Sequence, residues 1–287
     1  MKTRIALLTT LLAGQAFAAD MAPLTLDVYY GDENSFMVTS TLVQGETEAV
    51  LIDTGFTKAD ALRIAAKVLD SGKELKTIFI SQADPDYYFG AEVIHQFFPN
   101  AEIITTPAVK KVIEKKLAGK VAFWGPKMGA NAPVKPIVPE AVTVTSFSVN
   151  GTPIEIKGTE GVLAHRPYLW LPANKAILGN VGVFEGIHGW MADTQTDAEV
   201  AAWTAQLKEM QALQPQVVVP GHTTPDSSLN AEAIDYSLSY ISDFVEAKKS
   251  SKDSKSLIET MMKSYPDAAE PSSLDLSAKV HTGEMKW

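Results

Sequence analysis

The sequence predicts a four-layer α/β sandwich, in which two sheets face each other and helices cover both outer faces. Its 287 residues are 46% hydrophobic and 21% charged, which is typical of a globular protein with a large core. Predicted strands and helices are followed by a second set of strands and further helices. This order favours two packed sheets over one doubly wound sheet, in which strands and helices alternate throughout.

The first half of the chain supplies one sheet and its helices. Short runs with apolar alternation, separated by Gly- and Asn-containing breaks, predict strands, and apolar residues at helical spacing predict helices. The strands are expected at residues 24–30, 35–43, 48–53, 77–81 and 101–105, and the helices at 58–69, from Gly90 and at 107–116. Residues 123–130 are rich in glycine and aromatic side chains, and we expect a loop in which Trp124 covers a pocket or packs in the core.

The second half repeats the pattern with strands first. Strands are expected at residues 142–149, 153–157, 168–171, 175–178 and 216–219, and helices at 197–213 and 231–248. Residues 249–253 form a polar hinge, and the tail after Tyr265 is expected to be loosely ordered. The predicted organisation is a signal peptide at 1–18, one domain at 19–250, and a C-terminal helix and tail at 251–287.

The first residues resemble a cleavable secretory signal. Lys2 and Arg4 precede an apolar run from Ile5 to Leu12, and Ala16-Phe17-Ala18 places small residues where a signal peptidase cuts. The run is shorter than the roughly 20 apolar residues that a membrane span needs. We therefore expect cleavage after Ala18 and a periplasmic or secreted protein without membrane insertion.

Composition excludes several classes of chemistry. The chain has 34 acidic and 25 basic side chains, so the net charge of −9 disfavours binding to nucleic acid. It has no cysteine, which excludes disulfides, thiolate metal sites and a cysteine nucleophile. Neither a Gly-x-Ser-x-Gly elbow nor a phosphate-binding glycine loop occurs. The expected partner is a small molecule, and the oligomeric state is left open.

Four short segments carry a family resemblance. They are Leu-Ile-Asp-Thr-Gly at 51–55, Ile-Phe-Ile-Ser-Gln-Ala-Asp-Pro-Asp-Tyr-Tyr-Phe-Gly at 78–90, Ile-Leu-Gly-Asn at 177–180 and Val-Pro-Gly-His at 219–222. In this order they are similar to the landmarks of the metallo-β-lactamase superfamily. The resemblance implies an αββα sandwich with its metal site at the sheet edge, and it implies that Asp53 supports the floor of that site.

The metal-binding motif departs from the family. The His-x-His-x-Asp-His frame falls on Gln82, Asp84, Asp86 and Tyr87, so only the Asp keeps its identity. The bridging carboxylate position is Asn180, and the last histidine is present as His222. A further family histidine falls near Val162, three residues before His165, which could replace it only if the loop is shifted.

These departures leave two alternatives for the site. A dinuclear, histidine-rich zinc centre cannot be assembled, because amide oxygens are weak ligands. One ion, Zn²⁺, Mn²⁺, Mg²⁺ or Ca²⁺, could be held by oxygen-rich ligands and one imidazole. Alternatively, no metal is bound, and Gln82, Tyr87 and Asn180 form a hydrogen-bond network. The candidate ligands are Gln82, Asp84, Asp86, Asn180 and His222.

The remaining histidines are assigned from their places in the sequence. His188 follows the Asn180 landmark, where relatives line the substrate cleft, and we expect it there together with His165 and Trp124. His95, on a predicted helix, and His281, in the tail, are expected to be structural or exposed.

Two functions from different classes follow. In the first, an exported hydrolase acts on a small ester, lactone or amide, with one metal held by Asp84, Asp86 and His222 to polarise the carbonyl. Its catalytic residues are Asp86, Tyr87 and His222. In the second, a metal-free pseudoenzyme binds a small ligand or a protein partner without turnover. The intact frames around Asp86 and His222 favour the hydrolase, and the lost ligands argue against an efficient β-lactamase.

Overall fold

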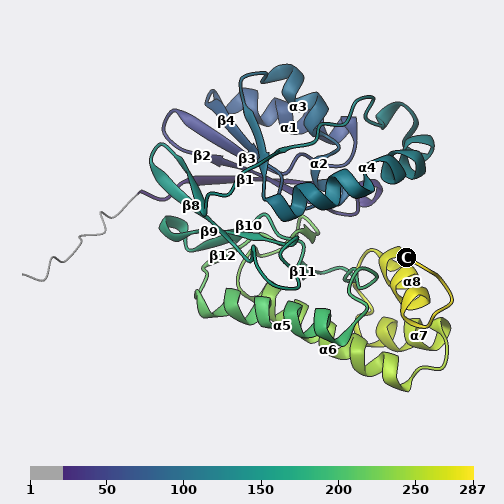
Figure 1. Ribbon diagram of the computed structural model, residues 1–287. Helices are drawn as coiled ribbons and strands as arrows, with labels where there is room; N and C mark the ends of the chain where they lie inside the picture. The colour runs from purple at the N-terminus through teal and green to yellow at the C-terminus, as the bar shows by residue number, and fades with distance from the viewer. Residues whose placement is uncertain (1–21) are drawn as a thin grey trace, which may run out of the picture.

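The computed structural model describes residues 22–287 and shows two sheets packed face to face, with helices outside each (Figure 1). The predicted four-layer αββα sandwich is confirmed. The predicted signal peptide at 1–18 lies outside the described residues. Within residues 22–287, no helix combines the length and apolar character needed to cross a membrane.

The first sheet contains six strands in sequence order. The pairs β1–β2 and β2–β3 are antiparallel, and β3 to β6 run parallel. Its strands are β1 (Thr25–Tyr30), β2 (Thr39–Gln44), β3 (Glu48–Ile52), β4 (Glu74–Phe79), β5 (Glu102–Thr105) and β6 (Glu140–Ala141). Its helices are α1 (Lys58–Ser71), α2 (Pro85–Tyr88), α3 (Ala91–Phe97) and α4 (Pro107–Met128), with short 3-10 turns η1 (Glu33–Ser35) and η2 (Gly129–Asn131).

The second sheet has the order β12-β10-β9-β8-β7. Its strands are β7 (Ser146–Val149), β8 (Thr152–Lys157), β9 (Tyr168–Leu171), β10 (Ala176–Leu178) and β12 (Val217–Val218), with the 3-10 turn η3 (Pro172–Asn174) between β9 and β10. A small parallel pair, β11 (Phe184–Glu185) and β13 (His222–Thr223), lies beside it. The second helix layer is α5 (Asp197–Ala212), α6 (Glu232–Ser250), α7 (Ser254–Ser264) and α8 (Pro271–His281).

Three apolar clusters hold these layers together. Val50 and Phe79 of the first sheet meet Leu169 and Leu178 of the second in the centre of the sandwich. A second cluster lies between the first sheet and α1, α3 and α4, and a third lies between the second sheet and α5 to α8. Each sheet therefore buries both faces, and polar residues gather where strands end.

Helix α1 also fixes the turn that reaches the site. Thr57 and Asp60 form a capping box at its first turn, which satisfies backbone N–H groups that the helix leaves unpaired. The buried Asp60 carboxylate also accepts hydrogen bonds from the hydroxyls of Ser35 and Tyr29. These bonds hold η1 against α1 and so place Phe36, which follows η1.

Two expectations for the irregular segments are wrong. The predicted loop at 123–130 is mostly helix, because α4 continues from residue 116 to Met128 and includes Gly119, Gly125 and Pro126. The tail after Tyr265 is ordered instead of loose, since it forms α8 with Leu274 and Ala278 completely buried against the second helix layer.

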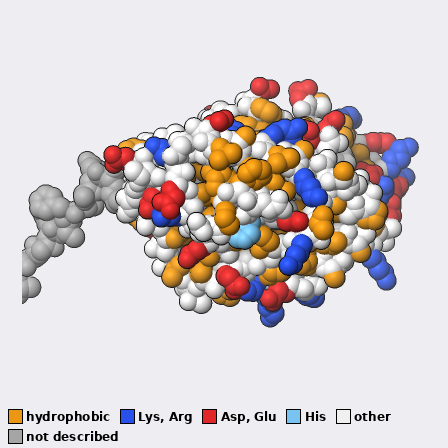
Figure 2. All heavy atoms as spheres, turned by 90° about the horizontal axis from the view of Figure 1, so that it is seen from above, with side chains coloured by type: hydrophobic (Ala, Val, Ile, Leu, Met, Phe, Trp, Pro, Cys, Tyr) orange, Lys and Arg blue, Asp and Glu red, His pale blue; other side chains and the backbone are white. Residues whose placement is uncertain are grey.

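The face seen from above in Figure 2 has hydrophobic side chains near its middle, with acidic and basic side chains interspersed around them. Exposed hydrophobic residues include Leu62 and Leu69 of α1 and Phe97 of α3. Scattered apolar side chains of this kind are normal on globular proteins.

Candidate functional site

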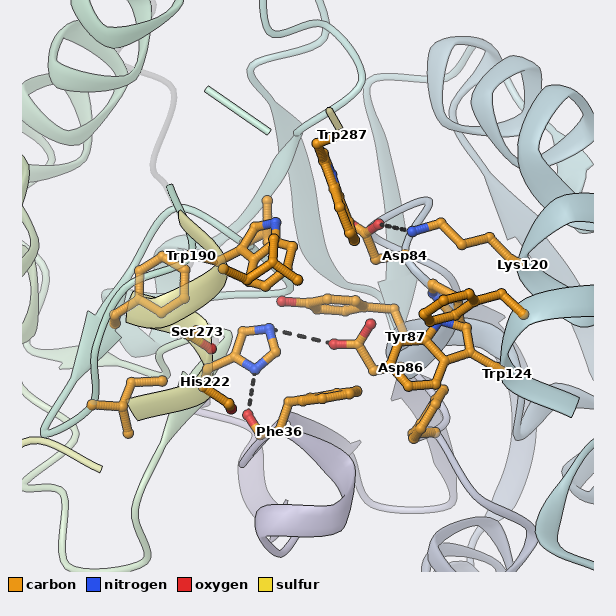
Figure 3. Close-up of a pocket in the computed structure, with 18 of the residues that line it drawn as sticks. Phe36, Asp84, Asp86, Tyr87, Lys120, Trp124, Trp190, His222, Ser273 and Trp287 are labelled. Atoms are coloured by element: carbon orange, nitrogen blue, oxygen red, sulfur yellow. Dashed lines mark hydrogen bonds and ion pairs between the residues drawn. The ribbon is translucent and has the colours of Figure 1, made fainter. Parts of the chain in front are cut away.

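A cavity of about 300 Å³ opens at the end of the sandwich, between α2 and α4 on one side and β11, β13 and α8 on the other (Figure 3). Its walls are largely aromatic, which gives the pocket an apolar interior. The aromatic lining consists of Phe36, Phe56, Tyr87, Phe123, Trp124, Phe184, Trp190 and Trp287. The charged lining residues are Asp84, Asp86, Lys120 and Lys127, and His222 adds an imidazole.

Asp86 and His222 face each other inside this pocket (Figure 3), with 3.4 Å between Asp86 Oδ2 and His222 Nε2. The other ring nitrogen, Nδ1, lies 2.7 Å from the Phe36 carbonyl oxygen. A carbonyl oxygen can only accept, so Nδ1 carries the hydrogen and the Nε2 lone pair points toward Asp86. The ring orientation is therefore fixed by the turn that α1 holds.

Burial keeps this pair uncharged. It lowers the pKa of His222 to about 4, because the imidazolium would lose its hydration. Burial also raises the pKa of Asp86 to about 8, and the neighbouring Asp84 charge adds to the effect. At neutral pH Asp86 is consequently a carboxylic acid that can donate to the bare Nε2 of His222.

Asp53 ties together the ends of β3 and β4 on the side of the site that carries Asp86. This residue has a left-handed backbone, with φ of 61°, and its carboxylate accepts from both the backbone N–H and the hydroxyl of Ser81 at 2.7 Å. Burial raises the pKa of Asp53 to about 7. The N–H of the next residue, Thr54, donates to the Tyr87 carbonyl at 2.8 Å. The ends of β3 and β4 thus position α2, as the family resemblance implied for Asp53.

Glycines allow the close approach of these loops. A Cβ on Gly90 would collide with the Thr54 carbonyl oxygen, and a Cβ on Gly221 would collide with the Asn180 carbonyl oxygen and the Tyr87 hydroxyl. The Tyr87 hydroxyl donates to that Asn180 carbonyl at 3.3 Å. Burial raises the pKa of Tyr87 well above its ordinary value, so the phenol keeps its proton.

The amides at the former ligand positions bond to the backbone. The Asn180 amide donates to the Val219 carbonyl at 3.0 Å and its oxygen accepts from the Val183 N–H at 2.9 Å. The Gln82 amide donates to the Pro167 carbonyl at 2.9 Å. Both side chains are about 1% exposed and neither lines the pocket. They stabilise the loops around the site and do not face its interior.

The donor set does not fit the metal centre of the family. Asp84 lines the same pocket but lies 3.5 Å from the Lys120 ammonium, on the rim (Figure 3). With Asp84 paired to Lys120, only Asp86 and His222 remain among the candidate ligands that line the pocket. Catalytic zinc sites use three protein ligands and a water. Within residues 22–287, no group of three or more His, Asp and Glu side chains is arranged to hold an ion. The side chains present therefore do not form the metal centre that the family implies.

The structure separates the residues expected in the substrate cleft. Trp124 lines the pocket and packs edge-on against Phe36 and Phe56, with ring centroids 5.4 and 5.3 Å away. His165 is half-buried and does not line the pocket. His188 is completely buried away from it, with Nδ1 3.1 Å from the Tyr240 hydroxyl.

The other histidines lie elsewhere. His95 is an exposed residue of α3, and His281 is half-buried in α8 with Nε2 2.9 Å from the Met191 carbonyl oxygen. Neither lines the pocket.

Sequence reasoning missed one wall of the pocket. Trp287 and Trp190 pack edge-on with 5.1 Å between ring centroids, and both indole N–H groups donate to Asp193. Ser272 and Ser273 of α8 complete this wall. No motif marks these residues, since only the packing of α8 brings them to the site. Lys120 and Lys127 were missed because α4 was expected to end at residue 116.

Comparison with known proteins identifies the family. The metallo-β-lactamase superfamily profile matches residues 34–222, and the chain belongs to that superfamily. A search of curated proteins finds no match.

Solved structures share the fold at low identity. A metallo-β-lactamase family protein from Thermus thermophilus is 15% identical with a TM-score of 0.65, covering 92% of this chain and 93% of its own. A metallo-β-lactamase from Pontibacter korlensis is 18% identical with a TM-score of 0.56, covering 78% of this chain and 96% of its own. At this level of identity the likeness establishes the fold alone.

Proposed function

We propose that this protein binds a small, mainly apolar or aromatic organic molecule in the pocket by contacts that require no metal ion. The observation that carries the proposal is the aromatic cavity with the uncharged Asp86–His222 pair in its wall. Its volume of about 300 Å³ is at the lower end of the range for small-molecule sites, roughly 300 to 1,000 Å³.

The polar groups of the pocket suit a ligand with one polar end. With its proton directed to His222, the Asp86 acid offers its other oxygen as an acceptor, and Ser273 offers a hydroxyl on the opposite wall. Aromatic rings supply most of the contact area, and their rigid side chains lose little entropy when a ligand binds. We also propose, from the pattern of residues 1–18, that the protein acts in the periplasm or outside the cell.

A fluorescence titration tests this function. The neutral probe N-phenyl-1-naphthylamine should bind at one saturable site, with the same Kd before and after EDTA treatment. Trp124→Ala should raise that Kd about tenfold, because it removes one aromatic wall. Phe97→Ala, which removes an exposed ring on α3, is the matched control and should leave the Kd unchanged. Binding that is absent, or equally sensitive to both substitutions, would refute the proposal.

The second candidate is hydrolysis of a small ester, lactone or amide, and the Asp86–His222 contact favours it. The bare Nε2 of His222 is a weak base toward water, because burial lowers its pKa to about 4, and neutral Asp86 is a proton donor beside it. Turnover of p-nitrophenyl acetate that His222→Ala and Asp86→Ala each abolish, and that His95→Ala leaves intact, would support this activity. Hydrolysis that survives both substitutions would rule it out at this site.

A further inference from the structure

We propose that the pocket selects an amphiphilic monoanion, with an aromatic or aliphatic body inside and a carboxylate at the rim formed by α4. This inference rests on the proposed function, because it names the class of molecule that the same pocket binds. It is carried by the position of Lys127 and by the distribution of charge among the lining residues.

Lys127 is the unpaired cation of the rim. Three other lysines of α4, Lys110, Lys116 and Lys120, each face a carboxylate at 2.9 to 3.9 Å. Lys127 lines the pocket and forms no ion pair with any carboxylate in residues 22–287. An anionic ligand would supply the missing partner.

Aromatic rings hold Lys127 at the mouth of the pocket. Its Nζ lies 3.7 Å from the Phe123 ring centroid and 5.6 Å from that of Trp124. Contact with a ring face leaves ammonium hydrogens free, and an ammonium has three of them to donate. A carboxylate bound there would remain next to water while its body contacts Trp124 and the rings behind it. This geometry suits an amphiphile better than a compact polar anion.

Both aspartates of the pocket lining already have a partner within the pocket. Asp84 is paired with Lys120, and Asp86 lies against the neutral His222 on the inner wall. Because Lys120 faces Asp84, Lys127 is the cation of the described lining that faces no carboxylate.

Two ligands of the same shape isolate the head group. 2-Naphthoate and 2-naphthamide share one ring system and differ in charge, and isothermal titration calorimetry can measure both on the full chain. At low salt we expect 2-naphthoate to bind more tightly than 2-naphthamide. Lys127→Met should raise its Kd about fivefold and change that of 2-naphthamide less than twofold, because only one exposed charge contact is lost. Raising the salt should also weaken 2-naphthoate selectively.

Lys115→Met is the matched control, since Lys115 is an exposed lysine of α4 that does not line the pocket. It should leave both Kd values unchanged. Equal affinity for the two ligands, or a preference for 2-naphthoate that survives Lys127→Met, would overturn the head-group inference and leave the proposed function standing. Failure of both naphthalene ligands and of N-phenyl-1-naphthylamine would overturn the proposed function and this inference together.

Discussion

Replacing Asn180 by Asp restores the side-chain type that the family uses to bridge two metals, and we expect it to destabilise this protein. The Asn180 amide donates to the Val219 carbonyl and accepts from the Val183 N–H. A carboxylate keeps the second bond and loses the first, so two acceptors would face each other in a site about 1% exposed. Losing a buried hydrogen bond and burying a charge should together cost about 3 kcal/mol.

The cost should depend on pH in a defined direction. The protonated carboxyl can still donate to Val219, so the folded protein favours that form and raises the pKa of the new group above its unfolded value of about 3.9. The destabilisation relative to wild type is therefore small below pH 4 and grows as the pH rises through the folded pKa. Near pH 7.5 the melting temperature should be lower by about 6 to 12 °C.

Thermal and urea unfolding, followed by circular dichroism at pH 3.5 and 7.5, measure this effect. Asn131→Asp, at an exposed position in η2, is the control and should change the free energy of unfolding by less than about 0.5 kcal/mol. If Asn180→Asp is as stable as wild type at pH 7.5, the amide bonds do not stabilise the site and our reading of the ligand positions is incorrect.

Three further outcomes follow from the same contacts. Gly221→Ala should lower the free energy of unfolding by about 2 kcal/mol, because its Cβ meets the Asn180 carbonyl. Gly119→Ala, whose Cβ meets open space in α4, should be neutral or stabilising in thermal unfolding, and equal changes in melting temperature would contradict the packing. Wild type should lose up to about 3 kcal/mol of unfolding free energy as the pH falls from 6.5 to 4, because burial lowers the pKa of the His222 imidazole to about 4. His222→Gln should abolish this pH-dependent loss. An unchanged pH profile of unfolding would count against this. Trp287→Ala should raise the Kd of N-phenyl-1-naphthylamine about threefold with little change in melting temperature, because Trp287 lines the pocket but is 45% exposed. An unaltered Kd would show that Trp287 does not contact the bound probe.

The fold was predictable because its signals are local. The landmark at 78–90 combines a buried strand with a polar loop and a helix, and β4, α2 and α3 form there. The position of Asp86 opposite His222 also followed from the order of the landmarks. The length of α4 was not predictable in this way. Gly119 and Pro126 disfavour helix locally, but α4 continues as a helix through both, and Trp124 and Val121 pack on the apolar cluster beneath it.

The composition of the pocket depends on long-range packing. Trp190, Lys127 and Trp287 come from segments far apart in the sequence, and α8 contributes Ser273 through a helix whose capping signal is weak. The hydrogen-bond partners of the two amides were equally unpredictable from the sequence. Gln82 and Asn180 have the same identity whether they bind an ion or a backbone carbonyl, and only the partner distances distinguish the two cases.

The most direct test of a metal-free pocket is elemental analysis of the protein purified from cells grown with added zinc and manganese. A second sample, stripped with EDTA and then soaked with each ion, provides the control. We expect far less than one ion per chain in both samples and an unchanged Kd for N-phenyl-1-naphthylamine. One or more ions per chain that EDTA removes, and that Asp86→Ala and His222→Ala each abolish, would contradict the account.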